Sequence, residues 1–373
     1  MSTKTKDDIQ EEALGVLLPL HRGGAGITMG AGKTLLGLRH FNILSKRAVQ
    51  ISAAPLKALV VAPKKSIFKS WEDDAKAFKL GHLLDNLTFT TYRSLTKHDL
   101  DYDIIYLDEC HSLLYSHKVW LEQYSGKIVG LTGTPPKFKG SEKAKMVEEF
   151  CPIVYTYITD DAIDDNILND YRITVHLLSL DPDKTMLVEK GDQSWYTSEV
   201  KTYTYWTGRI NDANTLKQKQ IYSVQRMKAM QQFPSKEVYA KKLFWQSDVK
   251  CILFANTQKQ ADKLCSYSYH SGNKSSEENL ENFKTGKIDK LSCVLQLNEG
   301  VNIPELREGI ILHAYGNNRK SNQRIGRLLR LNPDDVASIH ILCYKDSVDE
   351  VWTKEALSDL DQDKITWYDT EMP

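Results

Sequence analysis

Three short segments of this sequence combine residue types that act on phosphate groups. The first reads Met-Gly-Ala-Gly-Lys-Thr from Met29 to Thr34, the second is Asp108-Glu109-Cys110-His111, and the third runs from Gln323 to Arg330. Glycines and a lysine can hold phosphates, adjacent carboxylates can hold Mg²⁺ and activate a water, and arginines can stabilise charge on a phosphoryl group. In this order the segments predict a motor that hydrolyses ATP with Mg²⁺.

The glycine-rich segment lies where a phosphate-binding loop is expected. A short strand is expected at 26–29, directly before the segment, and a helical run begins at Thr34. Lys33 would neutralise the β- and γ-phosphates, and Thr34 would offer its hydroxyl to Mg²⁺. The general pattern has glycine where this chain has Ile27, so a plain glycine-rich turn stays an alternative. The residues expected to contact the nucleotide here are Met29, Gly30, Ala31, Gly32, Lys33 and Thr34.

Two carboxylates follow a buried strand in the second segment. Four apolar or aromatic residues at 104–107 lead directly into Asp108 and Glu109, which places both acids at the carboxyl end of a strand, where α/β sheets bind ligands. Asp108 would hold Mg²⁺, and Glu109 would orient and deprotonate the attacking water. The alternative is a loop with two solvated acids.

The third segment presents two arginines with helical spacing. Arg327 and Arg330 lie one turn apart, so both guanidinium groups can point the same way. Such a pair suits the arginine-finger role, in which cations stabilise the charge that develops on the γ-phosphate. Taken alone, the segment fits a basic surface helix better.

The pattern of apolar runs predicts an α/β fold with two lobes, each built on a parallel sheet. Short runs that are apolar on both faces alternate with helical stretches, as in buried parallel strands. We expect one lobe at 1–158 and another at 159–373, with a helical insertion at about 183–233, where strand signals are lost. Buried strands are expected at 58–62, 103–107, 127–131, 172–178, 251–254, 291–295 and 309–313.

Composition limits the possible classes of protein. The 373 residues include 49 Lys and Arg against 49 Asp and Glu, so any contact with nucleic acid must be local. No apolar run approaches the ~20 residues that cross a membrane, and the polar start lacks a secretory signal. The six cysteines form no Cys-x-x-Cys pair, which argues against a zinc site or a disulfide framework. These features favour a cytoplasmic protein with buried thiols.

Seven segments resemble, in type and order, the motifs of superfamily 2 helicases and translocases of the DExH type, here with a DECH box. The resemblance runs from about Gln10 to about Trp352, with most likeness to UvsW-like phage helicases and ResIII-like restriction motors. It implies two RecA-like lobes that couple ATP hydrolysis to stepping along nucleic acid. The matching segments are Met29–Thr34, Ala62–Lys65, Asp108–His111, Leu131–Pro135, Phe254–Thr257, Leu297–Pro304 and Gln323–Arg330.

The resemblance implies roles for further residues. Gln10 would recognise adenine, although its surroundings equally predict an ordinary amphipathic helix. Gly300 and Asn302 would approach the nucleotide from the second lobe, where the family often has Asp in place of Asn302, and Gln323 would contact the γ-phosphate or its water. The residues expected to couple nucleotide state to lobe closure are His111, Thr132 and Thr134. For His111, a structural role is an alternative.

A nucleic-acid track is expected at the ends of several strands. Lysines and backbone amides at a strand-to-helix junction can both face a phosphate, although polar side chains there also serve as helix caps. DNA is preferred to RNA because the resemblance is to DNA-remodelling members, and we expect a monomer in a bacterial or phage-infected cell. The residues assigned to this track are Pro63, Lys64, Lys65, Thr91, Tyr92, Asn256, Thr257 and Asn298.

The helical insertion interleaves aromatic and basic residues, including Trp195, Tyr196, Tyr203 and Trp206. Aromatic faces stack on bases and cations hold phosphates, so the insertion can grip nucleic acid; the alternative is that its aromatics pack it against a lobe. Other functions stay open: an ATP-switched DNA clamp or annealing factor, an RNA helicase, or a metabolic P-loop kinase. The acidic box and the paired arginines disfavour the kinase.

Overall fold

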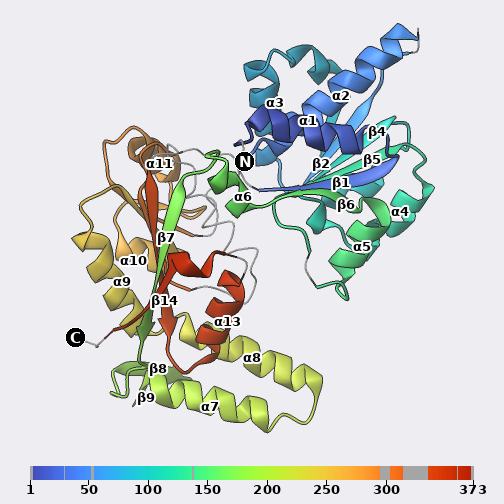
Figure 1. Cartoon of the computed structure of the whole chain (residues 1–373). Coiled ribbons are helices and arrows are strands. Elements are labelled where there is room, and N and C mark those ends of the chain that lie inside the picture. Colours follow the sequence, from blue (N-terminus) through green and yellow to red (C-terminus); the bar gives the residue numbers. More distant parts are fainter. Residues whose placement is uncertain are drawn as a thin grey trace. The chain divides into compact units, whose positions relative to one another are not determined.

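The chain folds into two α/β units (Figure 1). The computed structural model describes residues 3–28, 30–51, 54–136, 138–294, 303–313, 335–358 and 360–370. The first unit extends to Asn169 and the second begins at Asp170. Helix α6 (Thr159–Asp164), which the expected boundary at 158 assigns to the second lobe, belongs to the first unit. The prediction of two parallel-sheet lobes is confirmed.

The first unit contains a six-stranded parallel sheet in the order β3-β2-β4-β5-β1-β6. Its central strands are apolar runs buried on both faces, as parallel strands between helical layers must be. The strands are β1 (Arg22–Ile27), β2 (Ala58–Ala62), β3 (Leu87–Thr91), β4 (Ile104–Asp108), β5 (Lys127–Thr132) and β6 (Ile153–Tyr157). The other helices are α1 (Lys6–Leu17), α2 (Lys33–Gln50), α3 (Ser66–Ala77), α4 (Lys118–Gln123) and α5 (Glu142–Phe150).

Helices α2 and α3 approach each other closely because of one glycine. A Cβ atom at Gly37 of α2 would lie 2.4 Å from the Trp71 ring of α3, so any other residue there would push the indole aside. Glycine inside a helix costs roughly 0.5–1 kcal/mol relative to alanine. Trp71 itself is fully buried. The position of this indole is therefore set by close packing.

The second unit contains a seven-stranded parallel sheet in the order β11-β12-β10-β13-β14-β7-β15. Strands β7 and β14 pair along their whole lengths. The strands are β7 (Asp170–Leu178), β10 (Cys251–Ala255), β11 (Ser268–Tyr269), β12 (Lys290–Val294), β13 (Glu308–Ile311), β14 (Val336–Tyr344) and β15 (Ile365–Asp369). The helices around this sheet are α9 (Pro234–Gln246), α10 (Gln258–Leu264), α11 (Ser276–Lys284) and α13 (Val348–Leu357).

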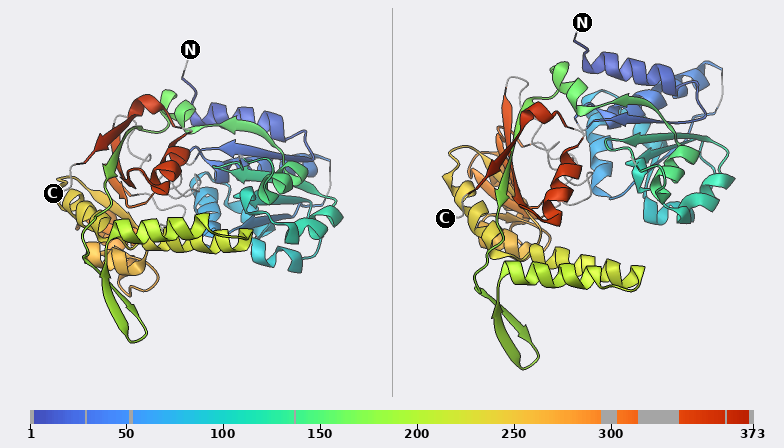
Figure 2. Two further views of the ribbon diagram at one scale, coloured as in Figure 1. Left: turned by 90° about the horizontal axis from the view of Figure 1, so that it is seen from below. Right: turned by 60° about the horizontal axis from the view of Figure 1, so that its bottom comes forward.

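The insertion in the second unit is partly different from the expected one. It contains the helices α7 (Glu199–Asn211) and α8 (Leu216–Met230), but a β-hairpin precedes them. Strands β8 (Met186–Lys190) and β9 (Gln193–Thr197) of this hairpin pair antiparallel. The helix pair and the hairpin project from the body of the second unit (Figure 2). The sequence pattern did not predict the hairpin.

A buried ionic cluster lies at the carboxyl ends of β13 and β14. The ammonium group of Lys236 donates to the carbonyl oxygens of Leu312, at 3.1 Å, and Leu342, at 2.9 Å. It also lies 3.0 Å from Nδ1 of His313 and contacts the carboxylate of Asp349. Burial raises the pKa of Asp349, but the charge of Lys236 and the hydrogen bonds from His313 and Lys236 hold this pKa at about 2. Asp349 is therefore ionised in the folded protein.

Two further observations concern the whole described chain. No helix in the described ranges is long and apolar enough to cross a membrane. All six cysteines lie within these ranges, and each is buried and outside any disulfide. The expectation of buried thiols is confirmed.

The cluster predicts the effect of one substitution on stability. Asp349→Asn removes the negative charge and leaves the Lys236 ammonium group buried without its counter-ion, which typically costs about 3–5 kcal/mol. Urea denaturation of the second unit should show a loss of this size, while Asp248→Asn, at an exposed acid, should change stability by less than about 0.5 kcal/mol. Equal, small effects of both substitutions would contradict the assignment of Asp349 as the counter-ion that stabilises buried Lys236.

Candidate nucleotide site

The glycine-rich loop joins the end of β1 to the start of α2, and its backbone conformation requires glycine. Gly30 and Gly32 have φ angles of 92° and 89°, in the left-handed region that other residues avoid. Gly32 is the N-cap of the eighteen-residue α2, and no side chain in the described structure caps this helix. Its first amides are therefore free to bind an anion, as helix N-termini do. Met29 lies outside the described residues.

Gln10 of α1 lies against this loop. Its side-chain amide donates to the carbonyl oxygens of Ala31, at 3.2 Å, and Gly32, at 2.8 Å. The residue is 1% exposed, and its Oε1 atom has no hydrogen-bond partner among the described residues. The structure thus brings Gln10 to the loop, while adenine recognition stays a prediction.

Glu109, directly after β4, lies within reach of three polar side chains. Its Oε1 atom is 3.5 Å from Nζ of Lys33, at the start of α2. Its Oε2 atom is 3.3 Å from Nδ1 of His111 and accepts a hydrogen bond of 3.3 Å from the hydroxyl of Thr132. Nδ1 of His111 also lies 2.8 Å from the hydroxyl oxygen of Thr132. The same hydroxyl accepts a hydrogen bond from the backbone amide of Thr134. These contacts join three predicted motifs.

The environment of Glu109 keeps its carboxylate charged. Burial raises the pKa, but the charges of Lys33 and His111, with hydrogen bonds from Lys33 and Thr132, outweigh burial and hold this pKa below its ordinary value. The residue also has a φ angle of 51°, which is unusual outside glycine and is often found at functional sites. The geometry supplies an ionised carboxylate beside a lysine.

Asp108 is positioned by Trp71 of α3, whose place in the sequence is that of an ordinary buried helical residue. The indole N–H of Trp71 donates to Oδ2 of Asp108 at 2.9 Å, in a buried environment. The hydroxyl of Tyr92 donates to the backbone carbonyl oxygen of Asp108 at 2.9 Å. These two bonds fix the side chain and the backbone of Asp108. Tyr92 was predicted to contact nucleic acid, but it is buried beneath the acidic loop.

A buried aromatic contact continues from Trp71 to α2. The Trp71 ring packs on Tyr106 of β4, with ring centroids 5.7 Å apart, and the Tyr106 hydroxyl lies 2.7 Å from Nδ1 of His40 in α2. Burial lowers the pKa of His40 to about 3, so this ring is neutral. Helices α2 and α3 are thus joined through the strand that carries the acids.

The predicted track residues of the first unit lie at one edge of the sheet. Lys64 and Lys65 are exposed between β2 and α3, and Thr91 ends β3. Because the strands are parallel, these positions share the carboxyl edge with the acidic loop and the glycine-rich loop. Pro63 is half-buried beside Lys64.

In the second unit, Asn256 and Thr257 follow β10, and the Thr257 hydroxyl caps α10 by accepting from the Gln260 amide at 3.2 Å. This bond gives Thr257 a structural role, while contact with nucleic acid stays a prediction for both residues. The remaining predicted site residues lie outside the described residues: Asn298, Gly300, Asn302, Gln323, Arg327 and Arg330.

The donor set suits a nucleoside triphosphate with Mg²⁺. The uncapped start of α2 and the cation of Lys33 fit phosphate oxygens. Within the described ranges no three His, Cys, Asp or Glu side chains gather as a metal centre. Mg²⁺ commonly uses only one or two protein ligands together with substrate phosphates and water. Asp108 and Thr34 would hold the ion in this manner.

Two family models match the chain. The description "Type III restriction enzyme, res subunit" applies to residues 7–137, and "Helicase conserved C-terminal domain" to residues 235–332. The first match spans the glycine-rich loop and the acidic loop, and the second includes the paired arginines. Each match thus falls on segments that the sequence singled out.

Two curated proteins are similar in sequence. The DNA 3'-5' translocase XPB2 of Sulfurisphaera tokodaii is 21% identical, over 90% of this chain and 81% of that protein. The pre-mRNA-processing ATP-dependent RNA helicase PRP5 of Vanderwaltozyma polyspora is 31% identical, but over only 26% of this chain and 13% of that protein.

Three solved structures share the fold. The LlaBIII Type ISP restriction-modification enzyme bound to DNA matches 99% of this chain with a TM-score of 0.62 and 14% identity, and this chain spans 32% of that enzyme. A putative HsdR subunit fragment from Vibrio vulnificus matches 97% of this chain and 67% of its own, with a TM-score of 0.61 and 16% identity. The Pyrococcus furiosus Hef helicase domain matches 92% of this chain and 96% of its own, with a TM-score of 0.51 and 15% identity.

The Trp71 contact predicts a measurable effect on Mg²⁺-dependent nucleotide hydrolysis. Trp71→Phe keeps an aromatic ring but removes the N–H that holds Asp108, and loss of such a supporting bond typically costs about 10- to 100-fold in metal affinity or activity. Hydrolysis should fall, and half-saturation should require more Mg²⁺. Trp120→Phe is the matched control, because the Trp120 indole donates to the carbonyl oxygen of His98 and not to a carboxylate. If both variants show the same Mg²⁺ dependence, Trp71 does not position Asp108 for Mg²⁺ binding.

Proposed function

Because the chain belongs to the superfamily 2 helicases and translocases of the restriction-motor type, and is therefore an ATP-hydrolysing enzyme, we propose that it uses this hydrolysis to move along DNA. The two family models fall on the residues that the site requires. The observation that carries the proposal is the contact network in which Lys33, His111 and Thr132 surround the ionised Glu109. This network links the phosphate loop to the segment after β5.

In the proposed reaction, each side chain has a defined task. The amides of the glycine-rich loop and Lys33 bind the phosphates of ATP. Asp108, held by Trp71, and Thr34 would hold Mg²⁺, and this ion would supply neutralisation of charge on the phosphate oxygens. Glu109 orients the attacking water and accepts its proton, because its carboxylate is ionised and buried. Arg327 and Arg330, by family resemblance, are proposed to stabilise the charge that develops.

We further propose that Thr132 and His111 transmit the nucleotide state. Both contact Glu109, and Thr132 also accepts from the backbone amide of Thr134. A shift of Glu109 during hydrolysis would therefore move the segment after β5. The second unit would respond through its own motifs, so that ATP hydrolysis in one lobe moves the other along the strand.

DNA is the proposed track, and fork or branched DNA the proposed substrate. The relative that covers 90% of this chain is named a DNA translocase. An RNA track is the second candidate, because the short match to PRP5 is with a protein named an RNA helicase. Action as a monomer in the cytoplasm of a bacterium or phage-infected cell is part of the proposal.

One comparison tests the track directly. The rate of ATP hydrolysis should be measured with single-stranded DNA, duplex DNA, branched DNA and RNA at equal nucleotide concentration. We expect stimulation by DNA, with branched DNA the most effective. A Lys33→Ala variant serves as the control for contaminating hydrolysis, since removal of the phosphate-binding cation should abolish turnover.

The other outcomes each exclude a part of the proposal. Stimulation by RNA above every DNA would replace the track by RNA. Strong DNA stimulation without strand displacement on fork, junction and flush duplexes would favour a translocase, clamp or annealing factor over a helicase. Hydrolysis that ignores all nucleic acids would remove the motor function.

A further inference from the structure

The insertion of the second unit has a charge that differs from that of the whole chain. We define the basic arm as helices α7 and α8, residues 199–230. It carries six Lys and Arg residues against two acids, although the whole chain is balanced at 49 against 49. Helix α8 alone has four basic residues and no acidic one. The basic residues of the arm are Lys201, Arg209, Lys217, Lys219, Arg226 and Lys228.

The two arginines of the arm hold its helices together. Arg209 of α7 donates to the Tyr222 hydroxyl of α8 at 2.6 Å and lies over its ring. Arg226 of α8 donates to the Thr207 hydroxyl at 3.1 Å and lies over the Tyr203 ring. These contacts, which include cation–π pairs, join the two helices through both arginines.

The outward face of α8 is formed by exposed residues at helical spacing. Lys217, Ile221, Val224 and Lys228 lie within one stripe, since each is three, four or seven positions from its neighbours, and all four are exposed. Within the described structure neither lysine pairs with an acid. The two lysines lie about 16 Å apart along the helix, from a rise of ~1.5 Å per residue.

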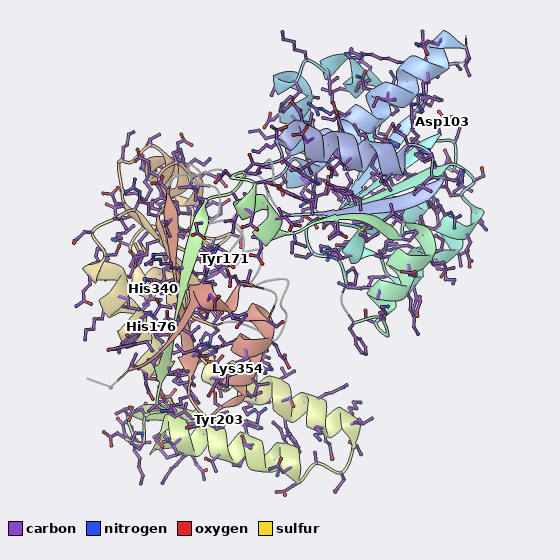
Figure 3. The ribbon with its side chains drawn as sticks, viewed as in Figure 1. Asp103, Tyr171, His176, Tyr203, His340 and Lys354 are labelled. Carbon is purple, nitrogen blue, oxygen red and sulfur yellow. The ribbon has the colours of Figure 1, made fainter. Side chains whose placement is uncertain are left out.

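The arm is held at its base by several hydrogen bonds. The carboxylate of Glu199, in the first turn of α7, accepts from the backbone amide of Asp181 at 3.0 Å. It also accepts from the amide and the hydroxyl of Ser235, at 2.9 and 2.8 Å. The amide of Val348 in α13 donates to the Tyr203 hydroxyl at 2.9 Å, where α7 meets α13 (Figure 3). A surface held in this way can bind a rigid partner without much ordering cost.

The base of the arm lies at the carboxyl edge of the second sheet. The insertion follows the end of β7 at Leu178, and Ser235 contacts the Tyr344 hydroxyl at the end of β14. The same edge carries Asn256 and Thr257 after β10. The basic arm is thus rooted at the edge that carries the predicted nucleic-acid residues of this unit.

We propose that the outward face of α8 binds the phosphate backbone of duplex DNA, and this inference rests on the proposed function. Lysine is a common phosphate contact, and a negatively charged backbone complements a helix without acids. Single strands are typically held by stacked aromatic side chains, but this stripe has none, since Tyr222 faces α7. Ile221 and Val224 between the lysines suit the sugar edges of the backbone.

The test compares charge removal on the arm with charge removal elsewhere in the same unit. The variant Lys217→Gln/Lys228→Gln keeps good helix formers, and Lys241→Gln/Lys242→Gln is the control. Both control lysines are exposed in the second half of α9, the helix that leads to the amino end of β10. Binding of a 20-base-pair duplex and of a single strand of equal length is measured by fluorescence anisotropy across a salt series.

We expect the arm variant to bind duplex at least about tenfold more weakly at 0.1 M salt. The slope of log K against log salt is negative, and its magnitude should decrease by about 2, since each phosphate contact contributes ~0.9. The control should match wild type, as should binding of the single strand and ATP hydrolysis without nucleic acid. Unchanged melting temperatures would show that the variants fold.

Each other outcome overturns a stated part. If wild type binds duplex and the arm variant has the same affinity and slope, the arm proposal fails while the motor function stands. Equal losses in the arm variant and the control indicate a general charge effect, and equal losses on single strand and duplex remove the duplex assignment. If wild type binds no nucleic acid, both the arm proposal and the proposed function fail. If the arm contacts another protein and not DNA, the arm variant should bind duplex with the same affinity and salt slope as wild type.

Discussion

The first unit depends on accommodating two adjacent acidic side chains, at least one of them ionised, in a buried position. Asp108 is 4% exposed and Glu109 is 8% exposed, and burying an ionised carboxylate costs several kcal/mol unless partners compensate. The partners come from separate elements: Lys33 from α2, Trp71 from α3 and Thr132 from β5. The acids at the end of β4 can therefore be accommodated only when the surrounding elements pack as they do.

The same constraint underlies the proposed response of the site to a nucleotide. Nζ of Lys33 lies 3.5 Å from Oε1 of Glu109. Lys33 is also the cation expected to contact the phosphates. In the proposed function, nucleotide binding would divide this single positive charge between a carboxylate and the phosphate groups. Because Glu109 also contacts His111 and Thr132, the proposal is that a change in its partners moves the segment after β5. Asp108 stays fixed by the Trp71 indole and the Tyr92 hydroxyl.

The sequence predicts most of what is local and contiguous. Strands β2, β4 and β10 are unbroken apolar runs, as buried parallel strands must be, and their ranges agree closely with expectation. Strand β1 is rich in glycine, so the expected strand at 26–29 covered only the end of Arg22–Ile27. The hairpin strands β8 and β9 alternate weakly and are largely exposed, which left no apolar pattern to detect. The acidic and glycine-rich loops were predicted because their residues are adjacent in sequence.

The missed features are those that only tertiary packing creates. Trp71 has the spacing of an ordinary buried helical residue, and its bond to Asp108 joins positions 37 residues apart. Tyr92 follows a strand end like a surface residue, but the 3-10 helix at Tyr92–Lys97 turns it beneath the acidic loop. Gln10 resembles any polar residue of an amphipathic helix until α1 packs beside the glycine-rich loop. Sequence spacing does not contain these contacts.

The central claim is that the ionised Glu109, held by Lys33 and His111, activates the attacking water. The most direct measurement compares ATP binding and ATP hydrolysis in Glu109→Gln, which keeps the shape of the side chain but cannot accept the proton. We predict ATP affinity close to that of wild type and hydrolysis reduced by about 10²- to 10⁴-fold, the usual contribution of a general base. Hydrolysis at the wild-type rate in a variant that binds ATP normally would contradict the claim.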